Sequence, residues 1–223
     1  MRTNLYHRTI FIVATLLLGA CGNQDNREQT QDNDSTTSKS IVEIKPKTIE
    51  DYFQQLKAKK YFSTAEGDKI ALNTLDIANG FMQISYNDVK AKVLVKATLK
   101  LWNKRKSEKD LVGIQFRHCV TQCIFKDPVF LEFDDEKYQE VTNSHYPANL
   151  KTYLKRRLAD YAKTCTGGSP FNAALLPQAG TDIQLVAMTT NPTGAPPCPQ
   201  ALLGLLKYNG DGFTFIEPVG KEE

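Results

Sequence analysis

The chain has 223 residues, of which 41% are hydrophobic and 24% are charged, and its formal net charge is +3. About 180 residues remain once the first 40 are set aside, which is the size of one ordinary domain with its own core. A net charge this small gives no general reason to expect a nucleic acid as a partner.

The N-terminus has three zones in succession. Arg2 and Arg8 supply positive charge, residues 10–18 form an apolar run, and the run ends in Leu18-Gly19-Ala20-Cys21. This is the layout of a secretory signal, and the run is too short to cross about 30 Å of hydrocarbon. Because a cysteine directly follows Leu-Gly-Ala, the segment resembles a bacterial lipoprotein signal.

The resemblance implies that residues 1–20 are removed and that Cys21 becomes the acylated first residue. Several acyl chains, such as palmitate, hold a protein stably on a lipid bilayer, whereas one chain holds it only marginally. Gly22 stands where retention in the inner membrane would usually need Asp, so the resemblance implies the outer membrane. The alternatives are an ordinary signal peptide before an unpaired thiol and an uncleaved membrane anchor.

Residues 21–40 are predicted to form a lipidated, disordered tether. From residue 22 to residue 40 there is no Ile, Leu, Val, Phe, Tyr or Trp, so this stretch cannot offset the entropy lost on ordering. At the stiffness of a flexible chain, about 19 residues extend over roughly 25 Å. The tether would carry a single globular domain, residues 41–218, followed by a tail of residues 219–223.

A helix is predicted to begin the domain, with Thr48 as its N-cap and Asp51 three residues later. It is expected to end near residue 59. Its apolar residues, which recur at helical spacing, are Ile49, Tyr52, Phe53 and Leu56.

Strand patterns dominate the residues that follow. Asn79-Gly80 lies between two alternating runs and predicts a hairpin in which both turn residues have positive φ. From Val89 to Leu101 the odd positions are apolar and most even positions are polar, which predicts one long strand, or two joined by a bend, with one buried face. Further strands are expected at residues 111–116, 129–133, 138–141, 182–188, 201–207 and 213–216.

Residues 148–163 change to a helical period. Their apolar stripe consists of Leu150, Leu154, Leu158 and Tyr161. Their basic residues, mainly off that stripe, include Lys151, Lys155, Arg156 and Arg157. Because strands outnumber helices and most are joined by short loops, the predicted fold class is α+β: mostly antiparallel β-sheet with an N-terminal helix and this basic amphipathic helix.

Four cysteines lie in the predicted domain, and an even number in an exported protein favours disulfides. Three pairings are possible. The pairs Cys119–Cys123 and Cys165–Cys198 are favoured, because each brackets a loop between candidate strands. Closing these loops would stabilise the fold by roughly 2 and about 3–4 kcal/mol respectively.

Residues 75–216 contain six stretches made of strands, turns and cysteines. They read LDIANGFMQI, VKATLKLWNKRKSEKDLVGIQF, HCVTQC, VFLEFDDEKYQEVT, LLPQAGTDIQLVAM and LLGLLKYNGDGFTF. Together they resemble a group of uncharacterised bacterial exported proteins and lipoproteins. The resemblance implies a shared β-rich fold and carries no activity with it.

The sequence has no motif that indicates catalysis, a metal or a cofactor. His118, Cys119 and Cys123 lie close together, but three residues separate the thiols and an oxidising compartment would pair them. The sequence contains neither a Gly-x-Ser-x-Gly elbow nor a glycine-rich phosphate loop. The acidic residues 134–136 fit a solvated hairpin turn better than an acid–base pair. We therefore do not expect an enzyme.

Charge is unevenly distributed along the chain. Residues 90–109 and 151–163 are mainly basic, whereas residues 127–140 are mainly acidic. A surface made of Lys96, Lys100, Arg156 and Arg157 could face a phosphate-bearing lipid, an acidic glycan or an acidic protein. Alternatively, lysines on the outer face of a strand keep it soluble and discourage unwanted pairing.

These observations predict a lipid-anchored outer-membrane protein whose domain is a non-catalytic binding or accessory module. Its partners would be the bilayer, through Cys21, and an envelope component or envelope protein. The alternatives are an enzyme that acts on an envelope polymer and an inhibitor of a host or rival enzyme.

Overall fold

The structure is a computed structural model that describes residues 46–64, 69–103, 109–165, 168–190 and 198–218. The described residues belong to one compact unit. The predicted signal (1–20), Cys21 and the tether (21–40), and the tail (219–223) lie outside the described residues.

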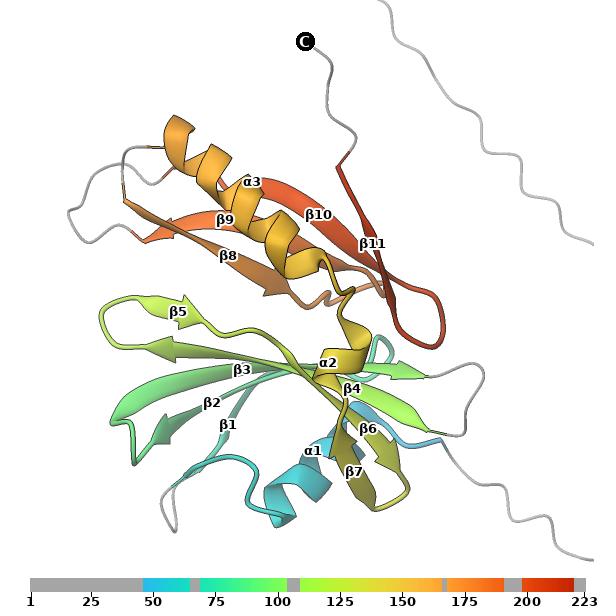
Figure 1. Ribbon diagram of the computed structural model, residues 1–223. Helices are drawn as coiled ribbons and strands as arrows, with labels where there is room; N and C mark the ends of the chain where they lie inside the picture. Colours follow the sequence, from blue (N-terminus) through green and yellow to red (C-terminus); the bar gives the residue numbers. More distant parts are fainter. Residues whose placement is uncertain (1–45, 65–68, 104–108, 166–167, 191–197, 219–223) are drawn as a thin grey trace, which may run out of the picture. The chain divides into compact units, whose positions relative to one another are not determined.

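The predicted α+β class is confirmed, because the described chain is mostly antiparallel sheet with a few helices (Figure 1). One sheet has the strand order β1-β2-β3-β4-β6-β7, with β5 paired to β4. Its strands are β1 (Ala71–Asp76), β2 (Phe81–Asp88), β3 (Val93–Asn103), β4 (Asp110–Cys119), β5 (Cys123–Phe125), β6 (Val129–Asp134) and β7 (Lys137–Glu140). We call it the large sheet.

The small sheet has the order β11-β10-β9-β8. Its strands are β8 (Ser169–Leu175), β9 (Ile183–Thr190), β10 (Ala201–Tyr208) and β11 (Phe213–Ile216). The prediction of only a loop between the basic helix and residue 182 is wrong, because β8 pairs with β9 along its whole length. Pro170 obscures this strand in the sequence, but β8 is an edge strand, where proline is tolerated.

Helix α1 (Ile49–Ala58) confirms the predicted N-terminal helix. The Thr48 side chain accepts a hydrogen bond from the Asp51 backbone N–H, and the Asp51 side chain accepts one from the Thr48 backbone N–H. This reciprocal capping box satisfies two donors at the helix start. The apolar face of α1 packs on one face of the large sheet, where Leu56 joins Ile84 and Val95 in the first core cluster.

Helix α3 (Leu150–Thr164) follows the short helix α2 (Thr142–His145) and lies across the small sheet (Figure 1). Its predicted apolar stripe packs in a second core cluster, where Leu150 is buried. That cluster also contains Trp102 and Phe130 from the large sheet, so it joins the two sheets. Gln115 Nε2, on β4, also donates to the backbone oxygen of Ala174, on β8.

The prediction of a strand from Val89 with one buried face is wrong in two respects. The chain turns at residues 89–92 before β3 begins, and Lys92 there has a φ of 53°. Both faces of the later part of β3 are buried. Leu99 packs on the α1 side, whereas Lys100 and Trp102 are also buried, because the second core cluster and the small sheet cover the end of β3.

The turn at Asn79-Gly80 also differs from the prediction. Residues Asp76 and Phe81 pair, so the turn has four residues, and of these only Gly80 has a positive φ (58°). The Asp76 carboxylate accepts hydrogen bonds from the Asn79 backbone N–H at 3.1 Å and from its Nδ2 at 2.9 Å. Asn79 therefore stabilises the turn through its side chain rather than through a left-handed backbone.

Both disulfides have the pairing that the loop argument favours. Cys119–Cys123 closes the turn between β4 and β5. Cys165–Cys198 links the C-cap of α3 to the segment that precedes β10.

Candidate functional site

A cleft of about 600 Å³ lies where turns from both sheets meet. The described residues that line it are 46–48, 77–80, 100–103, 180–181 and 208–210. These segments are the approach to α1, the β1–β2 turn, the end of β3, the turn before β9 and the β10–β11 turn. Residues more than 160 positions apart in the sequence thus share one cavity.

Local hydrogen bonds hold the walls of this cleft. The Asn209 side-chain oxygen accepts the backbone N–H groups of Asp211 and Gly212, each at 3.0 Å. Trp102 Nε1 donates to the backbone oxygen of Thr181 at 2.9 Å, which ties the end of β3 to the turn before β9. Together with the Asp76–Asn79 contacts, these bonds make the cleft a preformed feature of the fold.

Lys100 forms part of the cleft wall and is 2% exposed. It lies on β3, opposite Phe81 of β2 and Gly113 of β4. Its Nζ donates a hydrogen bond to the backbone oxygen of Asn79 at 2.6 Å. Within the described part of the chain, no carboxylate oxygen lies within 4 Å of this ammonium group.

Burial lowers the pKa of Lys100, and the charge of Asp76 opposes this shift only in part. The hydrogen bonds from Asn79 in turn lower the pKa of Asp76. Lys47 is the other charged residue among the described lining residues, and it forms an ion pair of 2.6 Å with Asp135. The described wall of the cleft therefore holds one cation with a carboxylate partner and one without.

The four residues of the predicted anion-facing surface differ in their exposure. The expectation that Lys100 lies on an exposed face is wrong, because the second core cluster and the small sheet cover that side of β3. Lys96 is half-buried on β3, whereas Arg156 and Arg157 are exposed on α3. The four cations lie on two elements, β3 and α3, and at different depths, and of the four only Lys100 lines the cleft.

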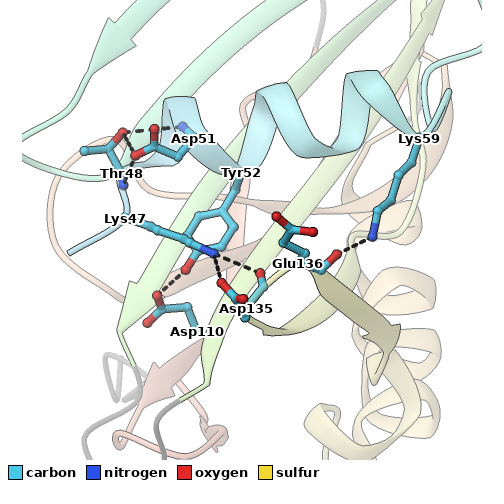
Figure 2. Close-up of polar contacts among 8 residues, drawn as sticks. All are labelled: Lys47, Thr48, Asp51, Tyr52, Lys59, Asp110, Asp135 and Glu136. Atoms are coloured by element: carbon cyan, nitrogen blue, oxygen red, sulfur yellow. Dashed lines mark hydrogen bonds and ion pairs between the residues drawn. The ribbon is translucent and has the colours of Figure 1, made fainter. Parts of the chain in front are cut away.

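The acidic hairpin turn, residues 134–136 between β6 and β7, contacts both ends of α1 (Figure 2). Asp135 pairs with Lys47, and the backbone oxygen of Glu136 accepts a hydrogen bond from Lys59. Beside them, the Tyr52 hydroxyl donates to the Asp110 carboxylate, and burial together with this bond raises the pKa of Tyr52. These contacts attach both ends and the middle of α1 to the large sheet.

Of the three residues considered for a metal site, Cys119 and Cys123 are joined in a disulfide. The ring of another histidine, His145, packs against Phe130 and Phe213. Among the residues that the structure describes, no group of three or more His, Cys, Asp or Glu side chains could hold a metal ion. None of the described helices has the length and hydropathy needed to span a membrane.

A second cleft, of about 680 Å³, adjoins the first and shares Gly180 and Thr181 with it. Its only charged residue among those described is Asp182. The sequence reasoning missed both clefts. The sequence contains two Asn-Gly pairs, Asn79-Gly80 and Asn209-Gly210, but nothing in it places their turns beside each other.

Comparisons with protein-family models, with curated proteins and with solved structures find no match to this chain. The resemblance to exported bacterial proteins therefore stays a prediction.

Proposed function

We propose that this protein is a lipid-anchored, non-catalytic binding module of the bacterial cell envelope, and that it binds a polar ligand in the first cleft. The observation that carries the proposal is the preformed cleft with Lys100 in its wall. Ligand sites are commonly concave, largely preformed and supplied with a few placed polar groups.

The chemistry of the wall favours binding over turnover. The described lining residues include lysine, asparagine, threonine, tyrosine and tryptophan, but no Asp, Glu, His, Cys or Ser. The carboxylates, imidazoles and thiols that most often act as general bases or nucleophiles are thus missing from this part of the wall, and its lysine, threonine and tyrosine side chains are the groups of this kind that it holds. Asparagine and threonine side chains and backbone groups instead suit hydrogen bonds to a polar molecule.

The anchor is inferred from the Leu18–Cys21 pattern. A lipid anchor at Cys21 would hold the domain at an envelope surface, which favours an envelope component as the ligand.

Site-specific crosslinking in intact cells tests the binding role. A photo-crosslinking amino acid replaces Ala78, which is exposed in the cleft wall, or Ala159, which is exposed on α3. We expect one defined envelope adduct from position 78 and none from position 159, read by mass spectrometry. Identical adducts from both positions, or none from position 78, would refute the cleft as the binding site of an envelope component.

The anchor is tested separately with Cys21→Ala. We expect the parent to incorporate labelled palmitate and to fractionate with outer membranes, and the variant to lose both properties, because the acylated residue is gone. Unchanged fractionation of the variant would rule out a lipid anchor at this residue.

A further inference from the structure

Lys100 has a buried charge that the described residues compensate only in part. Lysine is almost never fully buried unless it is paired, because an ammonium group loses its hydration on burial. Lys100 lies almost wholly out of solvent and, within the described residues, has no carboxylate close enough to pair with it. It also forms part of a cavity wall, so a bound molecule could supply the missing negative charge.

The neighbours of Lys100 compensate the charge only in part. An ammonium group has three donors, and the Asn79 backbone oxygen takes one of them. The charge of Asp76 acts on Lys100 from a distance, but its carboxylate is hydrogen-bonded by Asn79. Lys47, the other lining cation, is already paired with Asp135.

We propose that the ligand of this cleft carries a carboxylate group, which pairs with the Lys100 ammonium. This inference rests on the proposed function, since it names the chemistry of the ligand for the same cleft. Among the described residues Lys100 is a single cation without a carboxylate partner, so a ligand group with one negative charge would balance it. A phosphate monoester carries roughly 1.5 to 2 negative charges near pH 7 and would leave charge in excess. The remaining wall suits a hydroxyl-rich molecule, so a sugar acid represents the ligand class.

Trp102 provides a built-in reporter for the test. It is the only tryptophan of the chain, it lines the cleft, and its indole N–H donates to Thr181 in the same wall. The intact protein, purified from cells, is titrated with glucuronate, with glucose and with glucose 6-phosphate, while tryptophan fluorescence and the single indole N–H resonance are followed. Glucuronate and glucose differ only in the carboxylate.

We expect saturable binding of glucuronate, with an affinity at least tenfold higher than that of glucose or glucose 6-phosphate. Lys100→Met keeps most of the side-chain stem but removes the charge, and it should weaken glucuronate binding at least tenfold. Lys155→Met, at an exposed position on α3, is the matched control and should bind as the parent does.

The melting temperature of Lys100→Met distinguishes a ligand-binding role of Lys100 from a structural role. Replacing a buried charge that lacks a partner with a hydrophobic residue is often neutral or stabilising. Lys100→Met without ligand should therefore melt at or above the temperature of the parent. A melting temperature well below the parent's, with unchanged glucuronate binding, would overturn the inference and make Lys100 a structural link to Asn79.

Binding should also depend on pH. Among the described residues, the ionisable groups around Lys100 are Asp76 at the end of β1, Lys47 before α1 and Tyr208 at the end of β10. Because burial lowers the pKa of Lys100, glucuronate affinity should fall at a lower alkaline pH than for an exposed lysine. This pH-dependent loss should be absent from the residual binding of Lys100→Met.

Equal affinity for glucuronate and glucose would overturn the inference, and so would tighter binding of glucose 6-phosphate. These failures differ from a failure of the proposed function. If position 78 crosslinks an envelope component but Lys100→Met leaves glucuronate binding unchanged, the cleft binds a ligand and the carboxylate assignment is wrong. If glucuronate binds through Lys100 but position 78 yields no adduct, the carboxylate site stands and the envelope role does not.

Discussion

The cleft wall depends on a close contact between Gly113 and the ring of Trp102. Gly113 lies on β4 opposite Lys100, and a Cβ atom there would lie 2.7 Å from the Trp102 ring and 3.1 Å from the Phe130 ring. The absence of a side chain at this position leaves room for the indole ring. The position of the Trp102 ring therefore depends on the missing Cβ atom of Gly113.

Gly113→Ala should lower the free energy of unfolding by about 1–3 kcal/mol, because an added methyl group overpacks a filled core. Chemical denaturation followed by fluorescence of the single tryptophan measures the change. Ser169→Thr adds one methyl group at an exposed position of edge strand β8 and should change stability by less than about 0.5 kcal/mol. Equal effects of the two substitutions would contradict the packing argument.

At the level of elements, the two disulfides constrain loops of very different length. Cys119 and Cys123 are four residues apart and close a turn between paired strands. Cys165 and Cys198 are 33 residues apart, and their bond links α3 to the chain just before β10. In the chain-entropy model, the longer loop gains more from closure.

We expect removal of the Cys165–Cys198 bond, by Cys→Ala at both positions, to cost about 3–4 kcal/mol of stability. The same change at Cys119 and Cys123 should cost about 2 kcal/mol. Urea unfolding of the two double variants and the parent, all under non-reducing conditions, gives the comparison. If the short-loop variant is the less stable of the two, the entropic argument fails for this protein.

Across the whole molecule, tyrosines that pack in or against the first core make stability sensitive to alkaline pH. Burial raises the pKa of Tyr61 and of Tyr86 to about 12, and it also raises the pKa of Tyr52. A group whose pKa is higher in the folded state stabilises the fold below its unfolded pKa. That stabilisation is lost as pH rises through the folded value. For tyrosine this window runs from about pH 10 to pH 12.

We therefore expect the free energy of unfolding to fall steeply above about pH 10. Tyr86→Phe removes one of the ionising groups and should reduce the fall between pH 10 and pH 12 by about 2 kcal/mol. Lys100 acts in the opposite sense, because its lowered pKa makes stability rise as it deprotonates. Urea unfolding at several pH values tests this, and equal slopes for parent and variant would disprove the role of Tyr86.

Much of the fold could be predicted, because its local signals are short-range. The capping residues Thr48 and Asp51 mark α1, the apolar stripe marks α3, and alternation marks most strands. Predictions failed where a local signal was weak or shared by two structures. Pro170 concealed β8, and Asn79-Gly80 fits both a two-residue turn and the four-residue turn that forms.

The cleft and its charge could not be predicted in the same way. The alternation on β3 indicates which residues share a face, but it does not reveal that a second sheet covers that face. The sequence alone predicts that Lys100 is solvated. In the folded protein it is buried, because the small sheet packs over β3 and the turn at residues 77–80 lies beside it. Periodicity and turn residues depend on neighbours in the chain, whereas the burial of Lys100 depends on contacts between segments far apart in sequence.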